Sequence, residues 1–500
     1  MSGANGTIHN HHLCQIDIAT FMSALHLAVD RDLDVPIHRQ VREGLRRVIL
    51  EGMLRPGQRL PSTRALALDL GVSRLPVLSA YEQLLHEGYL VGRTGSGTFV
   101  SDAVPDELLR PPPSSGGVAT GRRRVGRQPL RRWTHPAVPF QVGLPAMDLF
   151  PHKAWRKLLV RQVNTETPEQ LSYTDPAGLE ALRIAIAEHI RSARAVRCEA
   201  SQVLIVPGSQ AALRLAAAAL IEPRDRVAIE EPGYFGAQRA LRASGAELVG
   251  VPVDAEGLNI AALRRRGTRI RAVYVTPSHQ YPLGVTMSAS RRFALLDWAA
   301  RQRAWILEDD YDSEFRYVSR PVAALQGMDA GDRVIYIGTF SKSLIPGVRL
   351  GYLVVPPELW DRFYQARLAF DFFTPTLYQR AIAEFMEGGH FDRHLRRMRN
   401  AYMERRDALL SGLARHCRNL VTIHNSDAGL HVTVLLRKGM NDRDLVTRLA
   451  GRGVAAIALS NSYAGPEAQQ GLLLGFGCST PQGLLDASRV LGELLRGSIE

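Results

Sequence analysis

Apolar residues near the start of the chain recur at the spacing of amphipathic helices. Residues 36–54 predict a helix that a Pro-Gly pair terminates. Its apolar face comprises Ile37, Val41, Leu45, Val48 and Ile49. Residues 61–71 predict a second, short helix capped by Ser62, and residues 72–88 predict a third capped by Ser73. Two strand-like runs, 89–91 and 98–100, follow with a glycine-rich turn between them. This order of elements predicts a winged helix-turn-helix.

After about residue 140 the pattern becomes an alternation of helical stretches with short runs rich in β-branched residues. These runs lie at 201–207, 225–232, 270–277, 303–310 and 332–339. Because helical stretches separate several of them, the runs predict a parallel sheet covered by helices. The fold class expected for this larger region is therefore α/β, with a mostly parallel sheet.

A polar segment separates the two patterns. Residues 110–133 are mainly Pro, Gly, Ser and Arg, with too few apolar residues to form a core. The expected organisation is a disordered leader at 1–30, the winged unit at 31–101, a linker at 102–138 and the large domain at 139–500. A start at Met22 is compatible with this leader. Residues 9–14 are rich in histidine, but nothing else supplies further ligands, so we expect no metal site.

Charge and cysteine content narrow the class of protein. The formal net charge is +13. Residues 36–101 carry nine arginines against five acidic residues, and residues 103–135 carry seven against two. This basic N-terminal part fits a polyanionic partner, and the linker arginines are either additional phosphate contacts or a solvated spacer. No apolar run is long enough to span a membrane and no export signal is recognisable. The four scattered cysteines fit a reducing cytosol, so we expect a cytoplasmic protein.

The N-terminal unit resembles the GntR family of bacterial repressors. The matching text is "RLPSTRALALDLGVSR" and "AYEQLLHEGYLVGRTGSGTFV". The resemblance implies operator DNA as partner, with contacts from Arg64, Ser73, Arg74, Gly95 and Gly97. The two arginines would reach phosphates or guanine edges, and the wing glycines would approach the minor groove. The chain departs from the usual family pattern directly after Arg74. A helical bundle whose arginines form a solvated face is the alternative interpretation.

One lysine in the large domain is notable because lysine is rare in this chain. Only four lysines, against 58 arginines, occur among the 62 basic residues, and Lys342 lies far from the others. A deprotonated lysine condenses with an aldehyde to form a Schiff base, which arginine cannot do. Lys342 is therefore a candidate for holding an aldehyde cofactor, although a lysine by itself is as easily a solvated side chain.

The residues around Lys342 have the chemistry that such a cofactor requires. Thr339, Ser341 and Arg349 offer two hydroxyls and a cation to a phosphate. Ser209 and Gln210 follow Gly208 where a strand passes into a helix, and a helix N-terminus also binds phosphate. Asp309 and Tyr311 end a strand-like run, placed to contact a pyridinium nitrogen and a ring oxygen. Each feature alone has an ordinary structural explanation, but together they predict pyridoxal 5′-phosphate.

Over residues 36–495 the chain resembles the MocR/GabR family, in which a GntR-type unit is fused to a fold-type I aminotransferase-like domain. The motifs are "EDDYDSEFRY", "GTFSKSLIPGVRLGYLV" and "MEGGHFDRHLRRMRNAY". The resemblance implies that Lys342 forms the Schiff base and that the large domain makes a head-to-tail homodimer. Tyr234 would stack on the cofactor ring. Tyr173 would reach the partner subunit's site.

Three departures from aminotransferases bear on activity. Tyr281 stands where these enzymes have an asparagine that contacts the ring oxygen. Leu473 and Gly236 stand where an arginine would hold a substrate carboxylate, so a bound amino acid lacks that anchor. We therefore expect a regulator that senses a small amine, an amino acid or pyridoxal 5′-phosphate itself, without efficient transamination. The alternatives are an aminotransferase with a DNA-binding arm and a dimerisation scaffold that has lost its cofactor.

Overall fold

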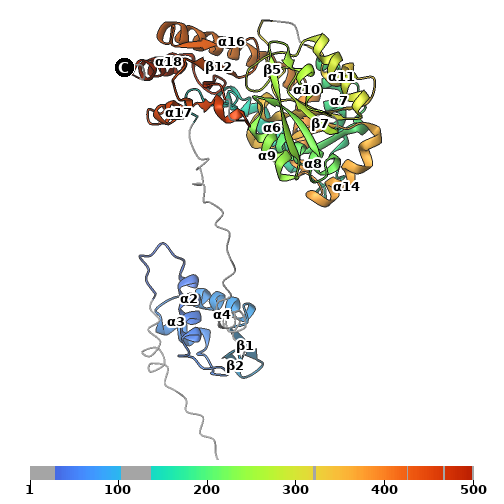
Figure 1. Ribbon diagram of the computed structural model, residues 1–500. Coiled ribbons are helices and arrows are strands. Elements are labelled where there is room, and N and C mark those ends of the chain that lie inside the picture. Colours follow the sequence, from blue (N-terminus) through green and yellow to red (C-terminus); the bar gives the residue numbers. More distant parts are fainter. Residues whose placement is uncertain are drawn as a thin grey trace, which may run out of the picture. The chain divides into compact units, whose positions relative to one another are not determined.

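The computed structural model describes residues 29–102, 137–267, 269–318, 322–424, 426–465 and 468–497. The predicted leader lies almost entirely outside these residues, as do most of the predicted linker and the histidine-rich segment 9–14. The chain divides into two compact units, Met1–Leu130 and Arg131–Glu500 (Figure 1), and each is described by itself.

The N-terminal unit contains three helices and a two-stranded sheet among its described residues. The elements are α2 (Ile37–Leu50), α3 (Thr63–Asp69), α4 (Arg74–His86), β1 (Leu90–Arg93) and β2 (Gly97–Val100). The predicted apolar face of α2 is buried except for Ile37, which is partly exposed. The Ser62 hydroxyl caps α3 by accepting a hydrogen bond from the Ala65 N–H at 3.2 Å. β1 and β2 pair antiparallel, so the winged helix-turn-helix prediction is confirmed.

The larger unit is organised around an eight-stranded sheet in the order β3-β10-β9-β8-β7-β4-β5-β6. Its strands are β3 (Val203–Val206), β4 (Arg226–Glu231), β5 (Glu247–Asp254), β6 (Gly257–Leu258), β7 (Ile270–Val275), β8 (Trp305–Asp310), β9 (Val334–Thr339) and β10 (Gly351–Val354). β5, β4, β7, β8 and β9 are parallel neighbours, while β10 runs antiparallel between β9 and β3. All five predicted runs form strands, and the mostly parallel sheet is confirmed.

Helices cover both faces of this sheet. The strands carry apolar side chains on both faces, so each face is buried under a layer of helices. One face packs against α8 (Ser209–Leu220), α9 (Phe235–Ala243) and α14 (Trp360–Phe370). The other packs against α6 (His152–Asn164), α7 (Glu180–Arg194), α10 (Ile260–Arg265), α11 (Ala289–Gln302), α15 (Thr376–Glu387) and α16 (His390–His416). Two short helices, α12 (Leu325–Met328) and α13 (Phe340–Ser343), flank β9. This doubly covered sheet explains why its strands are continuous apolar runs.

The C-terminal part of the larger unit forms a second sheet that the hydrophobic pattern did not predict. Its strands are β11 (Val421–Ile423), β12 (His431–Leu436), β13 (Ile457–Ala458) and β14 (Gly471–Gly475), in the antiparallel order β11-β12-β14-β13. Helices α17 (Asp442–Ala450) and α18 (Pro481–Arg496) lie close to it, and α18 packs along α16 (Figure 1). Among the described residues, no helix has the length and apolar content needed to cross a bilayer.

Candidate functional site

The three consecutive acidic residues at the end of β8 point to opposite faces of the sheet. Glu308 and Asp310 point to the α7 side, where Asp310 accepts hydrogen bonds from Arg194 at 2.8 Å and from the Tyr336 hydroxyl at 2.6 Å. Asp309 points to the other side, where its Oδ2 accepts a hydrogen bond from the Tyr274 hydroxyl at 2.7 Å. Its Oδ1 is buried without a partner among the described residues. Burial raises the pKa of Asp309 to about 7.

Lys342 lies in α13, directly after β9, and its ammonium group faces the same region as Asp309. Its Nζ donates a hydrogen bond to the Gly143 carbonyl at 2.5 Å. Gly143 has a φ of +85°, and a Cβ there would lie 3.1 Å from Nζ, so a side chain would crowd the lysine. Burial lowers the pKa of Lys342, while Asp312 and Asp309 oppose this shift. A lowered pKa favours the neutral amine that a Schiff base requires.

The residues predicted to bind phosphate lie at two places, the start of α8 and the segment around α13. Gly208 caps α8 with a φ of +84°, so Ser209 and Gln210 occupy the first turn of that helix. A Cβ at Gly208 would lie 3.5 Å from the Arg349 guanidinium, which therefore sits beside the helix N-terminus. Thr339 caps α13 by accepting a hydrogen bond from the Ser341 N–H at 3.2 Å. A helix N-terminus next to an arginine has the chemistry of an anion site.

Three of the predicted tyrosines form one aromatic group. The rings of Tyr234 and Tyr281 meet edge to face at 5.3 Å, and those of Tyr281 and Tyr311 at 6.2 Å. Gln210 donates a hydrogen bond to the Tyr234 hydroxyl at 3.2 Å, which ties this group to the start of α8. The fourth tyrosine lies elsewhere: the Tyr173 side chain is 80% exposed and packs edge-on against Phe372 and Phe373.

Several residues that the sequence reasoning missed lie against this group. His279 Nδ1 lies 2.9 Å from the Tyr311 hydroxyl and 3.0 Å from the Asp312 carboxylate. His431, from β12, packs against His279 with ring centroids 5.3 Å apart. The three potential ligand atoms of His279, Asp312 and His431 lie within 4.8 Å of one another, although the sequence predicted no metal site. Their separation along the chain left no local motif to reveal them, although His279 lies only two residues before Tyr281, which the sequence analysis singled out.

The two positions that lack an arginine, 473 and 236, have different surroundings. Leu473, on β14, is fully buried in an apolar cluster with Tyr281, Leu283 and Leu459. A Cβ at Gly236 would lie 2.4 Å from the Tyr234 ring and 2.7 Å from Gln210 Nε2. The absence of a side chain at 236 therefore lets Tyr234 fold against Gln210.

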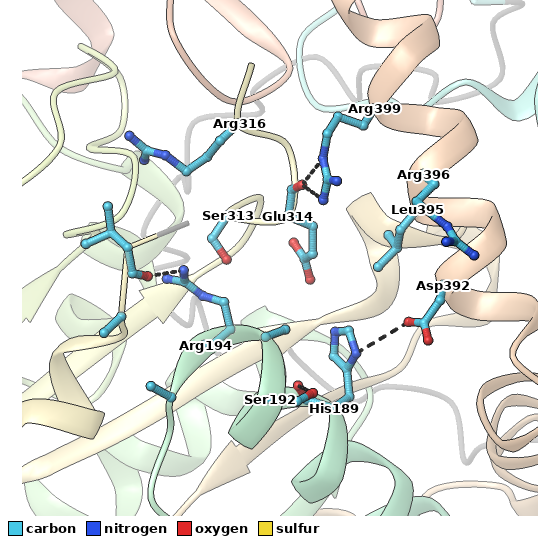
Figure 2. Close-up of a pocket in the computed structure, with 14 residues that line it drawn as sticks. His189, Ser192, Arg194, Ser313, Glu314, Arg316, Asp392, Leu395, Arg396 and Arg399 are labelled. Carbon is cyan, nitrogen blue, oxygen red and sulfur yellow. Dashed lines mark hydrogen bonds and ion pairs between the residues drawn. The ribbon is translucent and has the colours of Figure 1, made fainter. Parts of the chain in front are cut away.

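A cavity of about 790 Å³ lies next to the Ser313–Arg316 segment, lined by α7 and α16 as well (Figure 2). The Arg194 guanidinium donates hydrogen bonds to Asp310, Ser278 and the Val322 carbonyl. Arg399 donates to the Glu314 carbonyl at 3.0 Å. These arginines hold chain segments together, and the predicted cofactor residues do not line this cavity.

The predicted DNA-contacting residues come from α3, the start of α4 and the wing. Arg64 and Arg74 are exposed, and Arg74 Nε donates a hydrogen bond to the Thr63 hydroxyl at 3.2 Å. This bond joins the start of α4 to the start of α3. Ser73 stands at the N-cap of α4, but its side chain makes no capping hydrogen bond, contrary to the capping role expected from the sequence. Gly95 and Gly97 have φ of +75° and +108°, so the wing turn requires their conformational freedom.

Comparisons with known proteins agree with both units. The family "Bacterial regulatory proteins, gntR family" matches residues 37–100, and "Aminotransferase class I and II" matches residues 138–469. The probable rhizopine catabolism regulatory protein MocR of Rhizobium meliloti is 40% identical, covering 91% of this chain and 93% of its own. The pyridoxine biosynthesis transcriptional regulator PdxR of Corynebacterium glutamicum is 36% identical, covering 91% and 95%.

The fold of the larger unit also matches that of a solved structure. The α-aminoadipate aminotransferase LysN of Thermus thermophilus, complexed with N-(5′-phosphopyridoxyl)-L-leucine, is 30% identical with a TM-score of 0.67, over 72% of this chain and 92% of that one. Fold and site thus define a winged-helix DNA-binding unit joined to a fold-type I aminotransferase-like unit. The chain belongs to the MocR/GabR family of helix-turn-helix transcription regulators.

Proposed function

We propose that this chain is a transcription regulator that binds operator DNA through α3, α4 and the wing, and holds pyridoxal 5′-phosphate on Lys342. The small-molecule signal is an amine, an amino acid or the cofactor itself. One observation carries this proposal: the chain that places Lys342 and Asp309 in one site also carries a winged-helix unit, while Leu473 and Gly236 stand where an aminotransferase would have an arginine anchor.

The residues present fit the cofactor. Among the described residues, Asp309 Oδ1 is a buried acceptor without a donor, and a pyridinium N–H would supply one. Ser209, Gln210, Thr339, Ser341 and Arg349 would hold the phosphate, Tyr234 would lie against the ring, and Tyr281 and Tyr311 would face its oxygen. When bound, pyridoxal 5′-phosphate supplies an aldehyde that condenses with amines. Lys342 binds it, Asp309 holds a proton at the ring nitrogen, and the tyrosines exclude water.

The regulator proposal is tested by coupling between ligand and DNA. A duplex selected from a randomised pool by the cofactor-loaded protein serves as the operator. Its affinity is then measured with and without pyridoxal 5′-phosphate, and with a panel of amines and amino acids. We expect at least one of these ligands to change the affinity about 5-fold or more. An unchanged DNA affinity, together with rapid transamination of the same panel, would instead favour the aminotransferase.

The proposal includes a homodimer. Four apolar or aromatic residues of this region are exposed: Leu171 by 73%, Tyr173 by 80%, Phe370 by 46% and Phe372 by 41%. Exposed side chains of this kind fit a subunit interface. A head-to-tail arrangement would bring Tyr173 to the cofactor site of the partner. Light scattering should then give twice the chain mass.

Arg74→Ala should weaken operator binding about 10- to 100-fold, because a bidentate arginine contact to a guanine contributes about 1–3 kcal/mol. Fluorescence anisotropy at fixed salt measures this. Arg74→Lys is the matched control: it keeps the charge but loses the fork, so it should retain more affinity than alanine and lose sequence discrimination. Equal affinity of Arg74→Ala and wild type would remove Arg74 from the interface.

Asp309→Asn should weaken pyridoxal 5′-phosphate binding about 10- to 100-fold, since a charge-assisted hydrogen bond contributes roughly 1.5–3 kcal/mol. Titration of the visible absorbance measures the affinity. The control is Glu308→Gln on the opposite face, whose carboxylate accepts the Leu325 and Gln326 N–H groups, each at 2.8 Å. That variant should lose stability but keep its cofactor affinity. The reverse pattern would contradict the assignment.

A further inference from the structure

Behind the Tyr311 hydroxyl lies a buried histidine–aspartate pair. His279 Nδ1 lies 3.0 and 3.1 Å from the two carboxylate oxygens of Asp312, and 2.9 Å from the Tyr311 Oη. His279 and Asp312 are 3% and 2% exposed. A single nitrogen thus faces a carboxylate and a phenol at hydrogen-bond distance, away from bulk water.

This geometry decides where the protons lie. An ionised carboxylate can only accept hydrogen bonds, so the proton between it and His279 is on Nδ1. The Tyr311 oxygen then faces an N–H, and it accepts from that side. The phenol's own proton is consequently directed away from His279. The hydroxyl can donate it to another acceptor.

The surrounding fold enforces this arrangement. Gly429 has a φ of +78°, and a Cβ there would lie 2.0 Å from His279 Cε1 and 2.7 Å from Asp312 Oδ2, so only glycine fits. His431 Nε2 lies 3.1 Å from the Pro282 carbonyl, which also accepts from the Thr433 hydroxyl at 2.6 Å. Strand β12 therefore holds the Pro282 loop, which also carries Tyr281, against the pair.

We propose that His279, anchored by Asp312, is a positioning residue that fixes the Tyr311 phenol as a hydrogen-bond donor toward the ring oxygen of the bound cofactor. This role rests on the proposed function. His279 acts through Tyr311 and is not itself a catalytic residue. The other titratable groups that act on the trio include Tyr281, His431, Lys342, Asp309, Glu230, Arg316 and Tyr317.

The same side chains could instead coordinate a metal ion, because their ligand atoms converge. The hydrogen bonds favour the positioning role: Nδ1 of His279 is occupied by its proton, and Nε2 of His431 faces a carbonyl. Elemental analysis of the purified protein distinguishes the two. A stoichiometric metal that is lost in His279→Ala would overturn the proposal.

The test is the pH midpoint of the visible band of bound pyridoxal 5′-phosphate. Without the Tyr311 donor the ring oxygen holds nearby protons more tightly, so Tyr311→Phe should raise this midpoint by on the order of one pH unit. His279→Ala should raise it comparably, and the double variant should add little. His279→Asn, whose amide N–H replaces that of Nδ1, should restore most of the wild-type midpoint. A merely structural role would lower stability without this pattern.

A wild-type midpoint in His279→Ala, or additive effects in the double variant, would overturn the proposal. If His279→Ala does not fold, Asp312→Asn tests the same step, because it replaces the anchoring carboxylate by a neutral group; an unchanged midpoint there would also overturn it. A wild-type protein with no visible band after incubation with pyridoxal 5′-phosphate would instead refute the proposed cofactor, and this role with it.

Discussion

Lys342→Ala is expected to abolish covalent attachment of pyridoxal 5′-phosphate and with it the visible band, while the fold is retained. The reason is chemical, since Lys342 Nζ is the amine that lies beside Asp309 and Asp312, and its lowered pKa makes the neutral form accessible. Borohydride reduction followed by peptide mapping measures the outcome. In the wild type the reduced adduct should appear on the peptide that contains Lys342.

Two control variants distinguish Schiff-base formation by Lys342 from the effect of its positive charge. Lys342→Arg keeps a cation at the site but cannot form a Schiff base, so it should lack the adduct as completely as alanine does. Lys438→Ala removes an exposed lysine in a turn of the small-sheet region and should keep the adduct. An adduct that persists in both Lys342 variants would place the cofactor on another amine. Cofactor-dependent DNA binding without any adduct would show that signalling needs only non-covalent binding.

The hydrophobic pattern was sufficient to predict the elements around the site. The strands that carry Asp309 and Thr339 are short apolar runs buried on both faces, and such runs are readable without any structure. The same holds for Ser62, whose capping role depends only on the next three residues. Lys342 stood out because lysine is rare in this chain, which made a single residue informative.

Contacts between distant segments could not be predicted. His279, Asp312 and His431 come from three parts of the chain, and none of the three has a local motif. The alternation along β8 is a related case: "EDD" alone does not say that Asp309 faces Tyr274 and the proposed cofactor site, while Glu308 and Asp310 form contacts on the other side. The small sheet was missed because β11 and β13 are only three and two residues long, too short for a periodic signal.

Arg194→Met should destabilise the larger unit by about 3 kcal/mol or more, because it leaves Asp310 buried without its cation. The Arg194 Nε–Asp310 Oδ2 distance is 2.8 Å, and both side chains are nearly inaccessible. Burial acts to raise the pKa of Asp310, but Arg194 and Tyr336 lower it below its ordinary value. Urea unfolding followed by tryptophan fluorescence measures the effect on this unit, since no tryptophan lies within residues 37–100.

The destabilisation caused by Arg194→Met should depend on pH in a definite direction. In the wild type the lowered Asp310 pKa stabilises the fold above the unfolded carboxyl pKa, and this contribution is lost as the pH falls through the folded value. In Arg194→Met the same carboxyl is buried without its partner, so the difference in unfolding free energy between wild type and variant should become smaller as the pH falls.

The matched control is Arg191→Met on the same helix, where the ion pair with Glu199 is exposed and its N–O distance is 3.5 Å. An exposed pair contributes at most about 1 kcal/mol. Equal effects of the two substitutions would mean that Arg194 is not what keeps Asp310 ionised, and that its other partners, Tyr336 and Ser313, stabilise the carboxylate.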